Sequence, residues 1–192
     1  MSEADVWMDN ESWWVYGCRP SMAAAYARFH TRNRFHLRMA MSQTPEVEDA
    51  AYWEVELGRR ETAMQAGQAV HLVGVPKTVS TPPEPSSPTL EIGGLVSFWS
   101  IEHGDFQGCT FSILIDRFLE GRGLMYAMAE PAIREVIERH KLHRVMATQL
   151  PENLRSARLL RRLGFVVEGY ARDFLRINGR WRDTVLLSRL VE

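Results

Sequence analysis

The apolar residues in the middle of the chain form two almost unbroken runs. Residues 90–101 read LEIGGLVSFWSI and residues 109–115 read CTFSILI, with the polar turn EHGDFQ between them. Short apolar runs bounded by turn residues are typical of central strands that are covered on both faces. The pattern therefore predicts two strands joined by a short turn, the second of which is apolar at nearly every residue and is expected at the centre of a sheet.

Further stretches rich in aromatic and β-branched residues predict additional strands. WWVYGCRP at residues 13–20 combines strand-forming residues with a turn signal, and AVHLVGV and RVMATQL occupy residues 69–75 and 144–150. Near the end of the chain, two strand-like runs flank Asn178-Gly179, a dipeptide typical of tight hairpins. These runs predict an antiparallel hairpin at the end of the sheet.

Four segments predict helices, at residues 22–30, about 46–65, 124–140 and 154–163. Ser21 is positioned to cap the first of them, and Asn153 to cap the last, which ends at Gly164. Pro131 lies inside the third helix and should bend it, because proline lacks an amide donor and crowds the preceding turn.

About seven strands and four helices follow one another in mixed order, without an internal repeat. This order predicts an α/β fold around a mixed, mostly antiparallel sheet. Residues 1–192 are expected to form a single domain, since this length is enough for one substantial core. Residues 77–89 (KTVSTPPEPSSPT) are rich in proline and serine, and we expect a mobile surface loop there rather than a domain linker.

Composition narrows the class of protein. The chain is 45% hydrophobic and 24% charged, as ordinary globular proteins are, and its formal net charge is −1. That charge gives no general attraction to nucleic acid or to anionic membranes, although the excess of basic residues after residue 100 favours that half for any polyanion site. We see no signal-like segment and no apolar run long enough to span a bilayer. A cytoplasmic monomer or homodimer is expected.

Cysteine and histidine usage indicates neither disulfide nor metal chemistry. Cys18 and Cys109 are far apart in sequence, and reduced thiols are expected, with a disulfide as the alternative. His140 and His143 form a His-x-x-His pair without a cysteine or carboxylate at ligand spacing nearby. No metal site is predicted.

Two glycines stand one residue apart between the second apolar run and the third helix. Gly121 and Gly123 cost helix stability, so the pair indicates a requirement of the backbone. A bare turn from a strand into a helix aims several amides one way, and these bind phosphate together with the helix dipole. Leu124 excludes a nucleotide P-loop, which needs lysine there, and Tyr126 stands where the dinucleotide fingerprint needs a third glycine.

Three ordered motifs resemble the GNAT superfamily of coenzyme A-dependent acetyltransferases. The stretch EGRGLM at residues 120–125 resembles the Gln/Arg-x-x-Gly-x-Gly/Ala loop of that family. PENLRSARLLRRLGF at residues 151–165 resembles its Asn-x-x-Ser/Ala…Leu-Gly-Phe segment. The tail GYARDFLRINGRWRDTVL at residues 169–186 resembles the closing hairpin of ribosomal-protein-alanine N-acetyltransferases of the RimJ/RimL type, RimJ most of all. The likeness extends from about residue 92 to the end.

The resemblance implies a GNAT fold and a binding site for acetyl-CoA as co-substrate. The backbone of Ile113, Leu114 and Ile115 would lie along the pantetheine arm, and Asn153 would bond near it. The amides that would hold the pyrophosphate belong to Gly121, Arg122, Gly123, Leu124, Met125 and Tyr126. The residues alone leave other roles open: core packing for the strand residues, a solvated Arg122, and a helix N-cap for Asn153.

The chain departs from the family pattern at several positions. Glu120 replaces Gln or Arg, which is compatible with an anion site if the carboxylate points to solvent or pairs with Arg122. Met125 replaces the final Gly/Ala, as in the RimJ-type loop. Leu160 stands where many members have a tyrosine that protonates the leaving thiolate. Ser156 is the candidate for that role, because a hydrogen bond helps a thiolate whose acid has a pKa near ~8.5; a serine bonded to the helix backbone is the alternative.

The roles of further polar residues stay open. Arginines that share one face of the fourth helix could meet the 3′-phosphate of coenzyme A or solvent: Arg155, Arg158 and Arg162. Candidates for a general base, which a polar hairpin turn also explains, are Glu102, His103 and Asp105. Residues that could border the acceptor site, or only pair across the hairpin, are Tyr170, Arg172, Asp173, Trp181, Arg182 and Asp183.

The predicted reaction is direct transfer of acetyl from acetyl-CoA to an amine, without an acyl-enzyme. A protein N-terminal amine, with a pKa of roughly 7.7–8.0, is partly neutral at pH 7 and needs only weak base assistance. The resemblance alone selects this acceptor. The alternatives are a small-molecule amine, such as an antibiotic or an aminoacyl group, with Trp13, Trp14 and RMAMS near its pocket, and a non-catalytic acyl-CoA-binding module.

Overall fold

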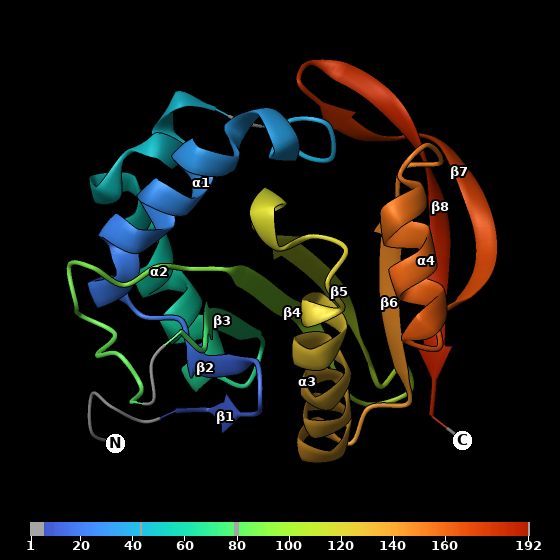
Figure 1. Cartoon of the computed structure of the whole chain (residues 1–192). Helices are drawn as coiled ribbons and strands as arrows, with labels where there is room; N and C mark the ends of the chain where they lie inside the picture. Colours follow the sequence, from blue (N-terminus) through green and yellow to red (C-terminus); the bar gives the residue numbers. More distant parts are fainter. Residues whose placement is uncertain (1–5, 43, 79–80, 192) are drawn as a thin grey trace.

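The computed structural model describes residues 6–42, 44–78 and 81–191. In these residues one sheet of eight strands has the order β1-β2-β3-β4-β5-β6-β8-β7 (Figure 1). Every neighbouring pair is antiparallel except β5 and β6, which are parallel. The strands are β1 (Met8–Asp9), β2 (Trp13–Gly17), β3 (Val70–Pro76), β4 (Gly94–Glu102), β5 (Gly108–Ile115), β6 (Arg144–Gln149), β7 (Val166–Ile177) and β8 (Arg180–Leu190).

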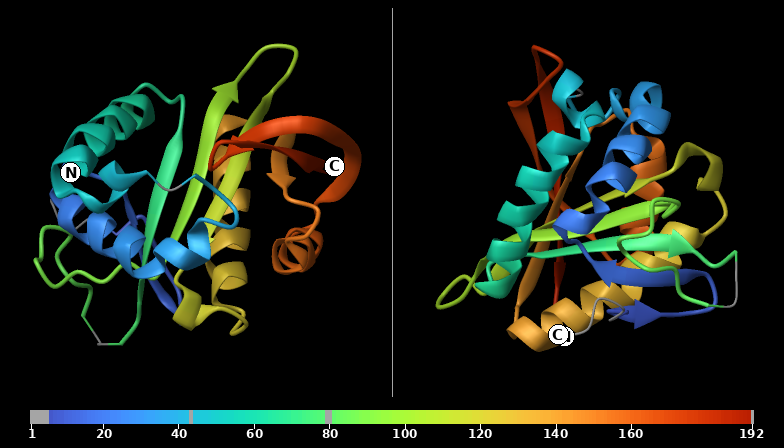
Figure 2. Two further views of the ribbon diagram at one scale, coloured as in Figure 1. Left: turned by 90° about the horizontal axis from the view of Figure 1, so that it is seen from above. Right: turned by 90° about the vertical axis from the view of Figure 1, so that its left-hand side faces the viewer.

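In the described part of the chain four α-helices pack on the sheet: α1 (Ala23–Leu37), α2 (Ala50–Gln65), α3 (Leu124–His140) and α4 (Leu154–Arg162). Two separate hydrophobic cores show how they are distributed. Tyr26 and Phe29 of α1 and Trp53 of α2 pack on one sheet face, whereas α3 and α4 pack on the other (Figures 1 and 2). The sheet therefore separates an α1–α2 layer from an α3–α4 layer.

The predicted α/β fold with a mixed, mostly antiparallel sheet is confirmed, with some corrections in detail. The described residues contain eight strands rather than about seven, because Met8–Asp9 adds a short edge strand. Ser21 does not cap the first helix: it lies in a 3-10 turn, Pro20–Met22, and α1 begins after it. The predicted second helix is divided into a 3-10 turn, Pro45–Glu48, and α2, whose N-cap is Asp49.

Helix α3 continues through Pro131, and the structure compensates for the missing amide. In a helix the amide at position 131 would donate to the carbonyl of Ala127. The side-chain amide of Asn10 donates to that carbonyl instead, at 2.9 Å. A residue at the start of the chain therefore satisfies the acceptor that proline leaves free.

The middle of the proline-rich segment, residues 77–89, is held to strand β2 by a hydrogen bond. Residues 81–89 contain turns but no helix or strand, as expected, while residues 79 and 80 of this predicted loop lie outside the described residues. The hydroxyl of Tyr16 donates to the carbonyl of Pro83 at 2.8 Å. Burial and the charge of Glu84 raise the pKa of Tyr16 to about 12, so this donor keeps its proton.

Both cysteines are buried and unpaired, as expected, and burial raises the pKa of each thiol to about 12. Among the residues that the structure describes, no group of three or more His, Cys, Asp or Glu side chains is arranged to hold a metal ion. The described helices include none that is both long and apolar enough to cross a membrane.

Candidate active site

The central feature of the site is a separation of two parallel strands. β5 and β6 pair only at Gly108–Arg144, Cys109–Val145 and Thr110–Met146. Beyond these pairs β5 continues to Ile115 and β6 to Gln149, and the two strands diverge (Figure 1). On its other side β5 stays paired with β4 as far as Ile115. Residues 111–115 therefore present one backbone edge that no described strand covers.

Ile113, Leu114 and Ile115 lie along this open edge, where the sequence places them. Ile113 and Ile115 pack toward the α3 side of the sheet and Leu114 toward the α1–α2 side. All three are only half-buried. Their side chains thus belong to the two cores while their backbone faces the gap, so core packing and a backbone contact with a ligand are compatible at the same residues.

The glycine loop follows β5 and leads into α3. Gly121 and Gly123 have φ values of 72° and 75°, in the left-handed region that favours glycine. A Cβ added at either glycine would meet no atom within 4 Å, so the loop is open on that side. Gly123 is the N-cap of α3 and offers no side chain to the first turn of the helix.

Unsatisfied amides gather at this loop. Within the described part of the chain, no protein acceptor bonds the amides of residues 121–126, and the first bond of α3 runs from Ala127 to the Gly123 carbonyl at 3.1 Å. Such amides, with the positive end of a 17-residue helix, form a site suited to phosphate groups. The loop therefore fits the diphosphate of a nucleotide coenzyme.

Glu120 does not pair with Arg122 and does not point freely into solvent. Its carboxylate contacts Nε2 of His36 at 3.1 Å and forms an ion pair with Arg155 of α4. Arg122 itself is exposed. Because one partner comes from α1 and the other from α4, Glu120 links the two sides of the opening between β5 and β6, and Arg155 compensates its negative charge.

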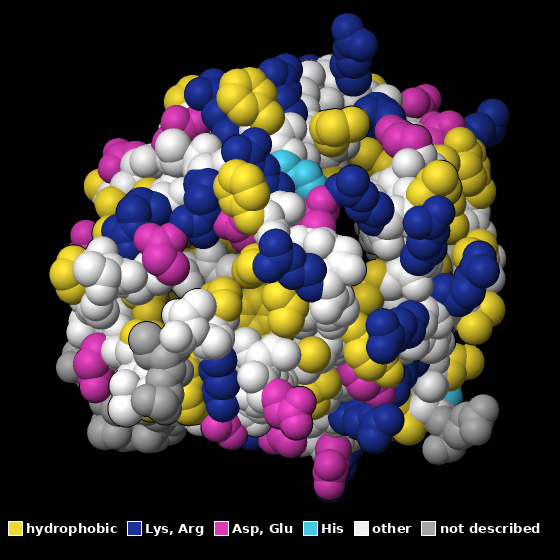
Figure 3. All heavy atoms as spheres, in the orientation of Figure 1, with side chains coloured by type: hydrophobic (Ala, Val, Ile, Leu, Met, Phe, Trp, Pro, Cys, Tyr) yellow, Lys and Arg dark blue, Asp and Glu magenta, His cyan; other side chains and the backbone are white. Residues whose placement is uncertain are grey.

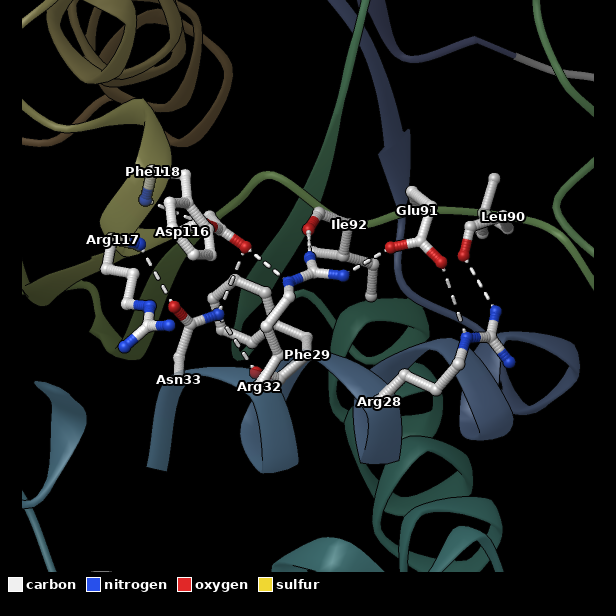
Figure 4. A network of polar contacts seen from close by, with 10 residues as sticks. All are labelled: Arg28, Phe29, Arg32, Asn33, Leu90, Glu91, Ile92, Asp116, Arg117 and Phe118. Carbon is white, nitrogen blue, oxygen red and sulfur yellow. Dashed lines mark hydrogen bonds and ion pairs between the residues drawn. The ribbon is translucent and has the colours of Figure 1, made fainter. Parts of the chain in front are cut away.

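A polar network fixes the base of the glycine loop to α1 (Figure 4). Asp116 is 3% exposed and accepts from Nε of Arg32 at 2.6 Å and from Nδ2 of Asn33 at 3.2 Å. It also caps the turn Arg117–Leu119 by accepting from the amide of Phe118 at 2.9 Å. Burial raises the pKa of Asp116, but these hydrogen bonds and the charge of Arg32 outweigh burial and lower it overall.

The sequence motifs did not predict this network. The available signal was weak, because a carboxylate directly after an apolar strand is also common in turns. Asn33 also accepts from the amide of Arg117 at 3.0 Å, and Arg32 reaches Glu91 and the carbonyl of Ile92. The helix residues thereby join three chain segments that are distant in sequence.

On the other side of the opening, α4 begins at Asn153. The Asn153 side chain accepts from the amide of Ser156 at 3.1 Å, which confirms the predicted N-cap. Ser156 is half-buried in the first turn of the helix. Leu160, at the position where a tyrosine was sought, is 2% exposed and packs in the core with Leu163 and Phe165. It offers no polar group.

The arginines that the sequence places on one face of α4 make different contacts in the structure. Arg155 pairs with Glu120, whereas the guanidinium of Arg162 lies 3.9 Å from the ring centroid of Tyr126. Arg158 is exposed. Figure 3 shows a hollow in this face of the molecule, with basic side chains gathered on its α4 side.

The predicted candidates for a general base lie away from the opening. Glu102 belongs to β4 and pairs in register with Gly108, at the end where β5 and β6 are joined. His103 and Asp105 lie in the exposed turn beyond it. The open edge of β5 begins at Phe111, about 10 Å along the strand from Gly108. A polar hairpin turn is therefore sufficient to explain these residues.

The C-terminal hairpin pairs within itself and touches the α1–α2 connection. Tyr170 donates to Asp183 at 2.6 Å, and the amide of Asp173 donates to the same carboxylate at 2.8 Å. At the tip, Nδ2 of Asn178 donates to the carbonyl of Arg38 at 2.7 Å, and its amide donates to Oγ of Ser42 at 3.0 Å. The hairpin thus borders the sheet face that carries α1 and α2.

Comparison with known proteins agrees with this geometry. The family model of the acetyltransferase (GNAT) domain matches residues 3–166. The chain belongs to the GNAT acetyltransferase family. The divergent strands and the bare glycine loop lie within the matched part of this GNAT chain.

Individual relatives place this GNAT chain more closely. Over 98 residues it is 44% identical to the [ribosomal protein uS5]-alanine N-acetyltransferase of Escherichia coli (strain K12), a match that covers 51% of this chain and 50% of that protein. The chain therefore spans about half the length of the curated relatives it matches. The predicted resemblance to the RimJ/RimL type is confirmed.

Solved structures extend the likeness to nearly the whole fold. The ribosomal-protein-S5-alanine acetyltransferase from Vibrio fischeri superposes with a TM-score of 0.87 at 29% identity, covering 97% of each chain. RimJ of Mycobacterium smegmatis, solved with a CoA-disulfide, gives 0.80 at 21% identity, covering 92% of this chain and 81% of that one. The second likeness supports the fold alone.

Proposed function

We propose that residues 1–192 form one catalytic domain that transfers the acetyl group of acetyl-CoA to an amine, with a protein N-terminal α-amine as the acceptor. The observation that carries the proposal is the bare loop with Gly121 and Gly123, placed directly beside the open edge of β5. The names of the two ribosomal-protein-alanine N-acetyltransferases described above support acetyl transfer to a protein amine.

In the proposed complex the amides of residues 121–126 hold the diphosphate of the coenzyme. The pantetheine arm then extends along Ile113, Leu114 and Ile115 as an additional strand partner, which brings the thioester to the point where β5 and β6 separate. Backbone amides of β5 at that point would stabilise the negative charge that develops on the thioester oxygen. Asn153, fixed as the N-cap of α4, lies on the opposite side of the gap.

Transfer requires a neutral amine and a stabilised thiolate. The amine attacks the thioester carbon and the C–S bond breaks, so that coenzyme A leaves as its thiolate, while the amine proton passes to water as the amide forms. Ser156 is the proposed donor to the departing thiolate, because its amide is held by Asn153 and its hydroxyl lies in the first turn of α4. A thiol pKa near ~8.5 means that one hydrogen bond is substantial assistance.

The acceptor is proposed to be a chain end rather than a small molecule. A hollow of about 620 Å³ on the α1–α2 face, lined in part by Arg60, His71 and Trp99, is shallow and open to solvent. The hollow lies at the end of the sheet where β5 and β6 are paired, away from the opening, so the names of the relatives support the choice of acceptor.

Coenzyme binding and transfer are tested with one pair of glycine variants. Gly123→Ala places a Cβ in the loop at a φ of 75°, whereas Gly67→Ala introduces the same strain, at a φ of 70°, in the turn after α2. We expect Gly123→Ala to weaken coenzyme A binding at least tenfold in calorimetry, and Gly67→Ala to bind like the wild type.

Labelled acetyl-CoA and peptides with free N-termini then test the transfer. Failure of every peptide to accept acetyl would refute this acceptor.

A further inference from the structure

A row of three polar residues crosses the sheet on the α1–α2 face and ends at the open edge of β5. His71 of β3 is the register partner of Ser97 of β4, and Ser97 is the register partner of Ser112 of β5. Residues opposite each other on antiparallel strands have Cβ atoms about 5 Å apart. The row therefore places three short polar side chains next to one another on neighbouring strands, and the structure gives a hydrogen bond between His71 and Ser97.

The face on which the row lies follows from packing. Leu95 and Leu114 are register partners that pack in the core beneath α1 and α2. Side chains alternate along a strand, and the register from residue 110 to residue 115 has no bulge. Ser97 and Ser112 consequently point to the same side as Leu95 and Leu114, which is the side that the C-terminal hairpin borders.

His71 forms the buried, inner end of the row. Nδ1 of His71 and Oγ of Ser97 are 3.0 Å apart, and His71 is 9% exposed. Burial, assisted by the charge of Arg60, lowers the pKa of His71 to about 4, so the ring is neutral near pH 7. A neutral imidazole has one nitrogen that can only accept a hydrogen bond.

The outer end of the row is Ser112, which is half-buried. The last paired residues of β5 and β6 are Thr110 and Met146, so Ser112 lies two residues beyond the point of separation. In the proposed function, on which this inference rests, the thioester reaches that point. An amine that approaches from the α1–α2 face would meet the hydroxyl of Ser112.

We propose that His71, Ser97 and Ser112 form a hydrogen-bond row that holds the attacking amine. His71 accepts the proton of Ser97, Ser97 accepts the proton of Ser112, and the lone pairs of Ser112 then face the gap as acceptors. An N–H group of the amine donates to Ser112, which directs the nitrogen lone pair toward the thioester carbon. Ser112 is the residue that contacts the substrate, and Ser97 and His71 are positioning residues.

The row also selects among groups that could occupy this point. Because each hydroxyl proton is directed toward His71, Ser112 accepts but does not donate. An amine or ammonium is therefore favoured over a carbonyl or carboxylate, which would need a donor. This preference suits an α-amine acceptor.

Steady-state kinetics with acetyl-CoA and an N-terminal peptide test the row. We expect Ser112→Ala to lower kcat about tenfold, the effect of one neutral hydrogen bond, with the KM for acetyl-CoA within about twofold of wild type. Ser112→Thr keeps the hydroxyl and should retain most of the rate. Thr184→Val is the control, since it removes a buried β-strand hydroxyl that has no hydrogen-bond partner among the described residues.

Non-additivity separates this role from a structural one. Ser97→Ala should lower kcat about threefold alone but should add nothing to Ser112→Ala, because residues that act as a unit are not additive. Nitrogen NMR of the wild type should show His71 with its proton on Nε2. Wild-type kcat in Ser112→Ala, additive effects in the double variant, or a proton on Nδ1 would each overturn the inference. Absence of transfer by the wild type would overturn the proposed function and this inference with it.

Discussion

Burial of a single histidine links the α1–α2 face to the acid stability of the protein. His71 packs against Arg60 of α2 and Ser97 of β4, and the carboxylates of Glu56 and Glu102 line the same hollow. Its pKa is lowered from 6.5 to about 4, mainly by burial and then by the charge of Arg60. In the unfolded chain the ring takes up a proton near pH 6.5, whereas in the folded protein it does so only near pH 4.

The sign of the pH dependence follows from this difference. Between about pH 6.5 and 4 the unfolded state binds more protons than the folded state. The contribution of neutral His71 to the free energy of unfolding is therefore fully present above pH 6.5 and is lost as the pH falls toward 4. The side chain of His71→Gln cannot titrate, so the free energy of unfolding of this variant should fall by about 3 kcal/mol less than that of the wild type over this range. Urea denaturation at pH 7.5 and 4.5 measures the difference. Equal losses in the two proteins would contradict the lowered pKa.

The connection between β5 and α3 combines an open loop with a firmly held base. Asp116 fixes the base to α1, whereas Glu120 joins the loop to His36 and to Arg155 across the opening. In the proposed complex the carboxylate of Glu120 lies close to the coenzyme diphosphate. Its negative charge opposes the ligand and also occupies Arg155, which would otherwise be available to a phosphate.

Removal of that charge should therefore strengthen coenzyme binding. We expect Glu120→Gln to lower the Kd of coenzyme A by up to about fivefold, because exposed ion pairs contribute at most about 1 kcal/mol. The gain should shrink at 0.5 M salt, where exposed charges are screened. Glu135→Gln removes an exposed i,i+4 partner of Arg139 on α3 and is the matched control. Weaker binding by Glu120→Gln would show instead that the ion pair orders the loop.

Several of these elements could be predicted from the sequence because each has a local cause. Gly121 and Gly123 were recognised because a strand-to-helix turn at positive φ requires glycine, and Asn153 because N-caps favour asparagine. The partners of Glu120 could not be predicted, because His36 and Arg155 are 84 and 35 residues away. The row through His71, Ser97 and Ser112 depends on strand register, which apolar runs do not determine.

The two layers of helices are held together by one sheet that is closed at one end and open at the other. Cross-strand pairing between β5 and β6 extends over only three residue pairs. Beyond these pairs, the interactions that join the two sides of the opening include the Glu120–Arg155 ion pair. They also include the hydrogen bonds between Asn178 and the α1–α2 connection. A coenzyme that fills the opening as an additional strand partner would join the two sides along the length of β5.

Coenzyme binding should consequently stabilise the whole molecule against thermal unfolding. A ligand that binds only the folded state at a concentration of 100 times its Kd adds about 2.7 kcal/mol. For a chain of 192 residues this corresponds to an increase of roughly 5–10 °C in Tm. Differential scanning calorimetry with coenzyme A measures the increase, which Gly67→Ala should retain in full. Gly123→Ala should lose about half of it or more at the same ligand concentration, since tenfold weaker binding leaves about 1.4 kcal/mol. Adenosine 3′-phosphate 5′-diphosphate keeps both phosphates of the diphosphate but lacks the pantetheine arm, and it should give a smaller increase, since it cannot reach the open edge of β5. An equal increase with both ligands would place the stabilising contacts at the glycine loop alone and would contradict the role of the strands.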